Sequence, residues 1–189
     1  MGFVEKRLRP RLLGVYALAL ILVWLAKPTQ TSLIWGLLFA VFGEGLRLWA
    51  TGHLLKNDAL TVTGPYAYLR HPLYFGTLSI GTGFAIMAST NWALLLWAAL
   101  LLGYFAYYMP YKNRIEGARL EEIYGDEYRR YSIAVPRLLP RLRAYRPLGA
   151  DVVNPTSWNW ERFSGNHEVG TAAVVGVGAA AMVVRWAIV

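Results

Sequence analysis

The chain has 189 residues, of which 56% are hydrophobic and only 16% are charged. This composition departs from that of soluble proteins and indicates a membrane protein of one domain or two small ones. There is no cysteine, which excludes disulfides, thiolate catalysis and cysteine-ligated metals. A metal site would need carboxylates beside the three histidines, His53, His71 and His167, and we expect none.

The net charge of +8 is distributed as in membrane proteins rather than nucleic-acid-binding proteins. Residues 1–11 hold four Lys or Arg and one acidic residue, and residues 111–146 hold nine Lys or Arg and five acidic residues. Both clusters flank apolar segments, whereas a nucleic-acid-binding protein carries a basic stripe on a soluble fold. We therefore expect membrane lipids and no nucleic acid as partners, with both clusters on the cytoplasmic side.

Five apolar segments are predicted to be transmembrane helices, because about 20 helical residues cross the hydrocarbon core. They are residues 12–26, 32–50, 73–88, 92–109 and 169–189. The first is expected to be retained, since no cleavage pattern follows it. The sequence lacks both strand–helix alternation and a GxGxxG turn, which excludes a Rossmann domain. The predicted fold is all-α, a polytopic membrane protein of one domain (1–189).

Only Ser89, Thr90 and Asn91 separate the third and fourth segments. A connection this short predicts a tight helical hairpin, which returns the chain to the cytoplasmic side. The stretch 64–76 and the polar residues that begin near Pro110 can therefore form one site. Two pairs of small residues, Thr77 with Gly81 and Ser79 with Gly83, have the spacing that lets membrane helices approach closely. In a Gly-rich chain the same spacing can also arise by chance.

Two ionisable residues, Glu44 and Arg47, lie within the second apolar segment. Charges inside a membrane favour a functional site, although these two can also neutralise each other. After the hairpin, residues 111–131 repeat apolar and aromatic side chains at three- and four-residue steps. This pattern predicts an amphipathic helix on the cytoplasmic surface. Residues 135–140, VPRLLP, then predict an extended segment bounded by prolines.

The stretch GPYAYLRHPLYFG (64–76) is predicted to interrupt regular helix. Gly64-Pro65 is a turn signal, and Pro72 disfavours helix at the residue before it. The stretch offers aromatic faces and hydrogen-bond donors that suit an adenine ring or a cationic ligand: Tyr66, Tyr68, Arg70, His71 and Tyr74. Tyrosines and arginines at a membrane interface give the same composition.

A second polar cluster holds Lys112, Arg114, Glu116 and Arg119. Lys112, Glu116 and Leu120 are four residues apart and share a helix face. A carboxylate there can bind a ligand ammonium or ribose hydroxyls while neighbouring cations orient an acidic group. The alternative is a surface ion pair worth a few tenths of a kcal/mol.

Three consecutive features resemble the isoprenylcysteine carboxyl methyltransferase and phospholipid methyltransferase superfamily. In chain order they are LTVTGPYAYLRHPLYFG (60–76), the hairpin and EGARLEEIYGDEYRRYSIAVPRLLP (116–140). The resemblance covers about residues 44–140, and its upstream part looks like bacterial members of the superfamily. It implies methyl transfer from S-adenosyl-L-methionine to a lipophilic or lipidated acceptor, by carboxyl O-methylation or phospholipid N-methylation. It also implies a cytoplasm-facing site in a prokaryotic inner membrane, and makes residues 141–189 a C-terminal extension with the last transmembrane helix.

The resemblance also implies roles for individual residues. Eight are expected to contact the cofactor: Leu60, Thr61, Tyr66, His71, Pro72, Leu73, Tyr74 and Glu116. Lys112, Arg114 and Glu116 are the expected catalytic residues. Gly117 stands where the family usually has a second glutamate, and Lys112 where it has a substrate-orienting arginine. Lysine loses the bidentate fork, so carboxylate recognition is weakened or passes to Arg114.

The expected chemistry needs neither a metal nor a cysteine, because methyl transfer from a sulfonium depends mainly on positioning. A carboxylate acceptor is already nucleophilic. An amine acceptor must lose a proton, for which His71 or Glu116 is the candidate base. Two other functions remain open, an NADPH-dependent relative of sterol-type reductases and a non-catalytic membrane scaffold that keeps the fold.

Overall fold

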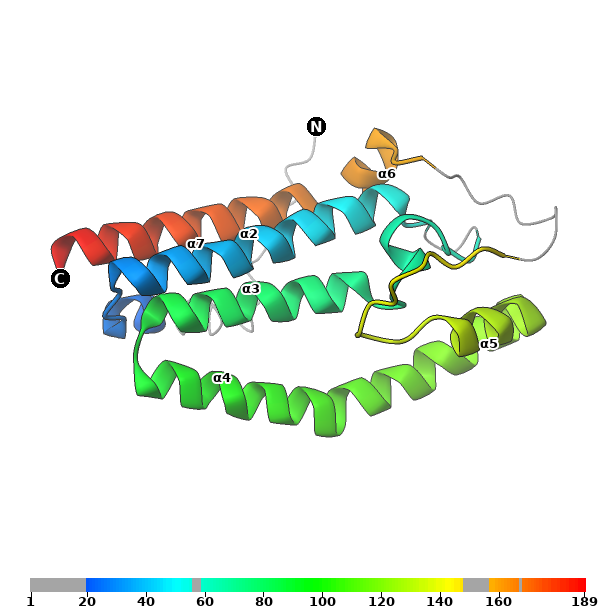
Figure 1. Ribbon diagram of the computed structural model, residues 1–189, viewed down its shortest axis with the longest axis horizontal. Coiled ribbons are helices and arrows are strands. Elements are labelled where there is room, and N and C mark those ends of the chain that lie inside the picture. The colour runs from blue at the N-terminus through cyan, green and yellow to red at the C-terminus, as the bar shows by residue number, and fades with distance from the viewer. Residues whose placement is uncertain (1–19, 56–58, 148–156, 167) are drawn as a thin grey trace, which may run out of the picture.

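The computed structural model describes residues 20–55, 59–147, 157–166 and 168–189 (Figure 1). All regular structure in these ranges is helical, which confirms the all-α prediction, and residues 20–25 are helical. The elements that follow are α2 (Gln30–His53), the 3-10 helix η1 (Gly64–Ala67), α3 (Pro72–Ala88), α4 (Asn91–Gly103), the π-helical η2 (Tyr104–Tyr108), α5 (Met109–Ala134), α6 (Trp160–Gly165) and α7 (Glu168–Ile188).

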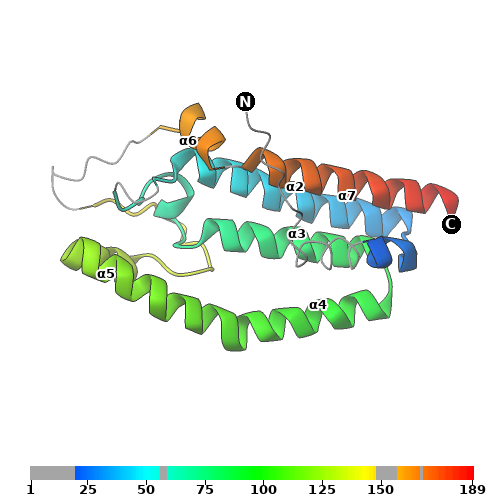
Figure 2. The same cartoon turned by 180° about the vertical axis from the view of Figure 1, so that it is seen from behind.

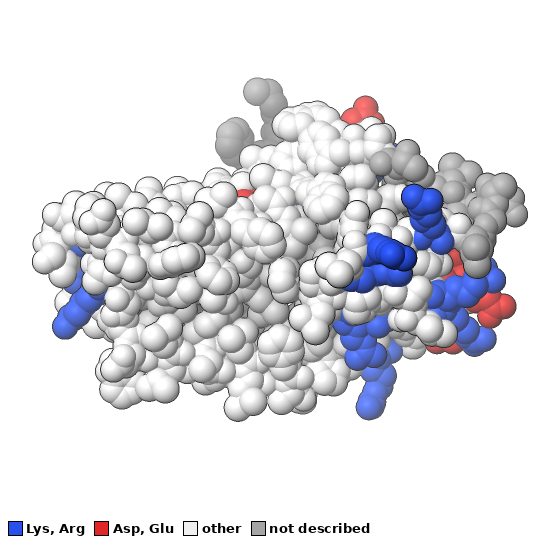
Figure 3. Space-filling model, viewed as in Figure 1, with Lys and Arg blue, Asp and Glu red and all other residues white. Residues whose placement is uncertain are grey.

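Three described helices are long and apolar enough to cross a membrane, namely α2, α7 and the continuous helix that runs from α4 into α5. Helix α3 is a shorter apolar helix. Most of the predicted first span, residues 12–26, and also His167 lie outside the described residues. Basic and acidic side chains gather at the α5 end of the molecule, whereas the helical body is almost uncharged on the face that Figure 3 shows. The chain is therefore an integral membrane protein.

Helices α2 and α3 pack closely because glycines face each other at two levels. A Cβ at Gly43 would lie 2.5 Å from the carbonyl oxygen of Gly76, and one at Gly83 would lie 2.5 Å from that of Gly36. The Ser79 hydroxyl donates to the carbonyl of Phe39 at 2.8 Å. Such close approach of small residues is typical of membrane helix pairs. The two helices run antiparallel and hold the start of α3 beside the end of α2 (Figures 1 and 2).

The predicted hairpin is confirmed, with α3 ending at Ala88 and α4 beginning at Asn91. Ser89 adopts a left-handed conformation with φ of 51°, and the Thr90 side chain caps α4 by accepting from the Ala93 N–H. Ala93 is the one buried residue of α4. The two helices therefore touch mainly at the hairpin and separate toward the other end.

The predicted helix over residues 111–131 is confirmed as part of α5, and it follows α4 without an intervening loop. Helix α4 continues through η2 into α5 as one helix of 44 residues. Pro110 lacks an N–H and would collide with the carbonyl four residues earlier in a regular α-helix. The π-helical turn avoids this, since the Met109 N–H bonds to the carbonyl of Tyr104, five residues back. A kink follows only at Gly125, where φ is 51°.

Of the two alternatives left open for Glu44 and Arg47, a mutual ion pair is not formed, because Arg47 pairs with Glu168 of α7. Arg47 Nε and Nη2 donate to the two carboxylate oxygens of Glu168 at 2.7 and 3.0 Å. Arg47 Nη1 also donates to the Thr77 hydroxyl at 2.6 Å. This ion pair joins α2, α3 and α7. Both carboxylate oxygens of Glu44 are buried, and neither has a hydrogen-bond partner within the described part of the chain.

Candidate active site

The 64–76 stretch is irregular at both of its predicted breaks. Gly64 has φ of 58°, and a Cβ there would lie 2.5 Å from the ring of His53, so the turn requires glycine. Pro65 then opens η1, and Pro72 opens α3. The chain between them turns back toward the end of α2 before it enters the membrane helix.

A second segment holds this stretch in place through its backbone. The Arg70 N–H donates to the carbonyl of Pro136 at 2.9 Å, and the His71 N–H donates to that of Arg137 at 3.1 Å. The Tyr131 hydroxyl, which is buried, donates to the carbonyl of Tyr66 at 2.8 Å. Because a buried backbone group left unpaired is costly, these bonds fix the conformation of the 66–71 backbone. The VPRLLP motif was predicted as extended, but nothing in the sequence indicated that it pairs here.

His71 links the stretch to α5. His71 Nε2 lies 3.1 Å from the side-chain oxygen of Asn113, so Nε2 carries the proton and Nδ1 presents a lone pair. The imidazole also stacks on the ring of Tyr74, with the ring centroids 5.2 Å apart. Burial lowers the pKa of His71, and the nearby Glu116 carboxylate opposes this shift only in part. The residue is therefore a neutral imidazole near pH 7.

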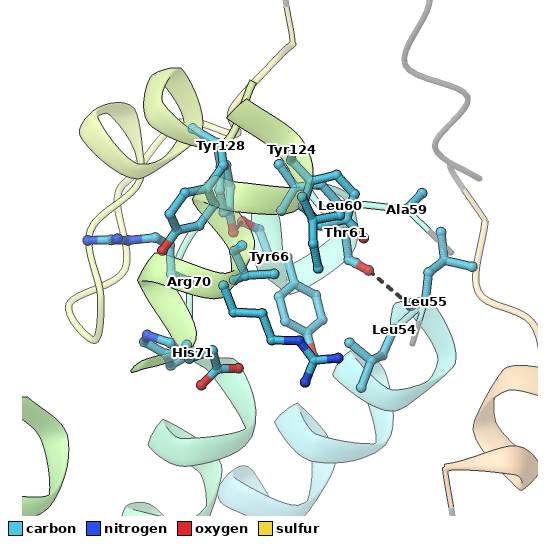
Figure 4. Close-up of a pocket in the computed structure, with 15 residues that line it drawn as sticks. Leu54, Leu55, Ala59, Leu60, Thr61, Tyr66, Arg70, His71, Tyr124 and Tyr128 are labelled. Carbon is cyan, nitrogen blue, oxygen red and sulfur yellow. Dashed lines mark hydrogen bonds between the residues drawn. The ribbon is translucent and has the colours of Figure 1, made fainter. Parts of the chain in front are cut away.

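A cavity of about 340 Å³, which we call the motif cavity, lies between the end of α2, the irregular stretch and α5. Figure 4 shows Tyr124 and Tyr128 on one side, Leu54 and Leu55 on the other, and Tyr66 between them. The Leu55 N–H donates to the Thr61 hydroxyl at 2.9 Å. Among the described residues, the lining is Leu54, Leu55, Ala59, Leu60, Thr61, Tyr66, Arg70, His71, Glu116, Arg119, Leu120, Ile123, Tyr124, Tyr128 and Tyr131.

A smaller recess of about 140 Å³ adjoins the motif cavity, with which it shares Tyr66, Arg70, His71, Glu116 and Leu54. Its other walls are Pro72, Leu73 and Tyr74, at the start of α3. All eight residues expected to contact a cofactor therefore line the motif cavity or the recess.

Two buried polar atoms at these cavities have no hydrogen-bond partner within the described residues. They are Oε2 of Glu116 and Nε of Arg70. Buried polar groups in proteins are almost always hydrogen-bonded, so an unpaired acceptor and an unpaired donor in one cavity fit a polar ligand. Tyr66 adds a neutral hydroxyl, because burial raises the pKa of its phenol.

Lys112 and Arg114 lie outside the linings of both cavities, four and two residues before Glu116. Arg70 and Arg119 are the cations that line the motif cavity instead. Tyr124 and Tyr128, which line the motif cavity from α5, were not predicted as part of the site, although their spacing is visible in the sequence. Leu120, Tyr124 and Tyr128 follow Glu116 in steps of four, and residues at this spacing share a helix face.

A third space of about 530 Å³ lies where α3 and α4 separate, and we call it the α3–α4 groove. It meets the recess at Leu73 and Tyr74, which line both. Its other walls are mainly apolar and aromatic: Leu78, Trp97, Leu100, Leu101, Tyr104 and Tyr108, with Arg47 and Thr77 beside them. The recess and a mainly apolar groove between α3 and α4 thus adjoin each other.

Comparison with known proteins places these features in a family. The family model described as phospholipid methyltransferase matches residues 14–127. Protein-S-isoprenylcysteine O-methyltransferase of Homo sapiens is 30% identical over 128 residues, covering 59% of this chain and 42% of the human protein. Cobalt-zinc-cadmium resistance protein CzcN of Cupriavidus metallidurans is 32% identical over 125 residues, covering 65% of this chain and 54% of that protein. The chain spans about half the length of these relatives, and no solved structure matches it.

Proposed function

The chain belongs to the phospholipid methyltransferase family, and from this premise we propose that it transfers a methyl group from S-adenosyl-L-methionine to a lipophilic acceptor. The observation that carries the proposal is the unpaired Glu116 and Arg70 atoms beside tyrosines in the motif cavity, with an apolar groove adjoining. Residues 44–140 then form the methyltransferase core, and residues 141–189 form the extension.

The residues around the motif cavity suit the parts of S-adenosylmethionine. Tyr66, Tyr124 and Tyr128 present aromatic faces for the adenine ring. Glu116 can accept from ribose hydroxyls or from the ammonium group, and Arg70 can donate to the carboxylate. The cofactor supplies a methyl group on a sulfonium, which is electrophilic without a metal.

The recess is the meeting point of donor and acceptor in this proposal. Leu73 and Tyr74 border both the recess and the groove, so an acceptor whose tail lies in the groove presents its head group there. Holding the two reactants in line is the main catalytic contribution that such a site makes. His71 adds a neutral imidazole, which can accept a proton at Nδ1 if the acceptor is an amine.

We place the motif cavity at the cytoplasmic face of a prokaryotic inner membrane. The charged end of the molecule supports this, because basic residues mark the cytoplasmic side of membrane proteins (Figure 3). Lys112 and Arg114 lie on α5 near this face and remain candidates for orienting an acidic acceptor as it enters.

Cofactor identity is tested by titrating S-adenosylmethionine and NADPH separately into detergent-purified protein. We expect saturable binding of S-adenosylmethionine alone, weakened at least tenfold by Glu116→Gln, since a charged hydrogen bond contributes about 1.5–3 kcal/mol. Glu122→Gln is the matched control, because Glu122 is exposed on the same helix and lines neither cavity. Binding of NADPH instead, or equal binding of S-adenosylmethionine by the Glu116 variant and the wild type, would contradict the proposal.

The acceptor is identified by incubating the protein with a labelled methyl donor and a total lipid extract of the host. A labelled phospholipid would indicate N-methylation of an amine head group, and a base-labile methyl ester on a lipidated cysteine would indicate O-methylation. Label found only in water-soluble metabolites would contradict a lipophilic acceptor.

A further inference from the structure

Two apolar spaces follow one another along α3. The first is the α3–α4 groove, and the second is a cavity of about 380 Å³ nearer the hairpin, which we call the hairpin cavity. The hairpin cavity lies between α3 and α4 and is also lined by Val174, Gly178 and Met182 of α7. Among the residues that the structure describes, Trp97 and Leu100 alone line both spaces. They stand at the boundary between the groove and the hairpin cavity.

The Trp97 indole is held in position from two sides. Its ring lies against Gly81 of α3, where any Cβ would overlap it. Its Nε1–H donates to the Thr82 hydroxyl at 3.1 Å, and that hydroxyl donates in turn to the carbonyl of Leu78 at 2.8 Å. An apolar ring with its one polar atom satisfied makes a fixed wall in an apolar channel.

The position of this wall along the membrane follows from helix geometry. Gly81, which contacts Trp97, is seven residues from Tyr74 at the recess, or about 10 Å along α3. Ala88 lines the far end of the hairpin cavity a further seven residues on, again about 10 Å. The indole therefore divides the channel near its middle.

We propose that Trp97 sets the length of the hydrocarbon tail that the protein accepts. A tail entering from the recess fills the α3–α4 groove and ends against the indole, and the hairpin cavity stays beyond its reach. The inference rests on the proposed function, in which this groove takes the acceptor tail. The occupant is a single hydrocarbon chain, because the groove is mainly apolar, adjoins the recess at Leu73 and Tyr74 and lies between α3 and α4.

The test measures the Kd of saturated fatty acids, from butanoic to octadecanoic acid, on the detergent-purified full chain by native mass spectrometry. For the wild type we expect the Kd to fall by about fourfold for each added methylene until the tail reaches the indole, and then to stop falling. In Trp97→Ala, and to a smaller extent in Trp97→Leu, this break should move to longer acids, because the two spaces are joined.

Three controls fix the interpretation. Trp92→Ala removes an indole of the same helix that is 81% exposed and lines neither space, and Trp97→Phe keeps an aromatic ring, so both should keep the wild-type break. Leu101→Trp fills the groove itself and should weaken the binding of every acid. An unchanged break in Trp97→Ala and Trp97→Leu, or undiminished binding by Leu101→Trp, would overturn the inference.

The same preparations are assayed for binding of S-adenosylmethionine and for methyl transfer to the lipid extract, so that the two proposals can fail separately. A shifted break without methyl transfer supports the tail channel and removes the proposed function. Methyl transfer with an unshifted break keeps the function and overturns the role of Trp97.

Discussion

At the scale of single residues, His71 shows how this site sets a protonation state. Its imidazole is buried, donates from Nε2 to Asn113 and stacks on Tyr74. Burial disfavours the charged form more than the Glu116 carboxylate favours it, and Arg70 and Arg137 act in the same direction as burial. The result is a neutral ring whose free nitrogen is available to a ligand.

The stability of the protein is expected to depend on pH through this residue. Because the folded pKa lies below the ordinary value of about 6.5, the unfolded chain binds the proton more readily between the two values. Thermal midpoints in detergent should therefore fall as the pH is lowered below about 6.5. His71→Gln should flatten part of this slope, and an identical slope in the variant would contradict the assignment.

The sequence was informative at this scale where a residue type is chemically distinctive. The tyrosines, His71 and Glu116 could be selected because the site needs aromatic faces and a carboxylate, and Tyr66, Tyr74, His71 and Glu116 all line the cavities. Lys112 and Arg114 could not be excluded, because only the packing of α5 against the 64–76 stretch decides which of its residues reach the cavities. Arg70 Nε could not be recognised as unpaired without the surrounding backbone.

At the scale of elements, glycine decides which helices meet. On α2, a Cβ at Gly43 would collide with the backbone of α3, whereas one at Gly45, two residues later, would have no neighbour within 4 Å. The small-residue spacing on α3 was readable in the sequence, but the partner helix was not. Ser79 and Gly83 face α2, while Gly81 faces Trp97 of α4.

Alanine at the two α2 positions should therefore have opposite effects. Gly43→Ala places a Cβ against the Gly76 carbonyl and is expected to destabilise the fold by about 1–3 kcal/mol, as overpacking does. Gly45→Ala meets no neighbour and is expected to stabilise the helix by about 0.5–1 kcal/mol. Thermal unfolding in the same detergent measures both, and a loss of stability at both positions would argue against the close α2–α3 contact.

A second glycine pair tests the geometry of α5. Gly117 is helical, and a Cβ there meets only the Tyr128 hydroxyl at 3.4 Å, so Gly117→Ala should stabilise by about 0.5–1 kcal/mol. Gly125 has φ of 51°, so Gly125→Ala should destabilise by about 1–2 kcal/mol. Equal effects of the two substitutions on the free energy of unfolding would mean that the kink is not at Gly125.

At the scale of the whole molecule, the fold depends on the hairpin and on contacts between segments that are far apart in the sequence. The all-α fold and the meeting of the 64–76 stretch with α5 follow from hydrophobic length and a short turn, so both could be predicted. The Arg47–Glu168 pair joins residues 121 positions apart, and charge alone pointed to the nearer Glu44. Sequence distance favours a local partner, but the packing of α7 against α2 brings the Glu168 carboxylate to the guanidinium.

This ion pair is expected to hold α7 on the bundle. Its side chains are only 15% and 4% exposed, so Glu168→Gln leaves a poorly compensated buried charge and should cost about 3–5 kcal/mol of unfolding free energy. Glu121→Gln is the control, because its pair with Arg129 is exposed and its loss should leave the thermal midpoint unchanged. Equal midpoints for the two variants would show that α7 is held by its apolar contacts alone.

The backbone bonds from Arg70 and His71 to residues 136 and 137 have a consequence for biosynthesis. The ribosome must make the whole α3–α4 hairpin and α5 before the motif finds its partner, and the hairpin can enter the bilayer well before that. A nascent chain halted near the end of α5 would then be inserted, but its 64–76 stretch would lack this backbone support. We expect translation to separate membrane integration from the assembly of the site, in that order.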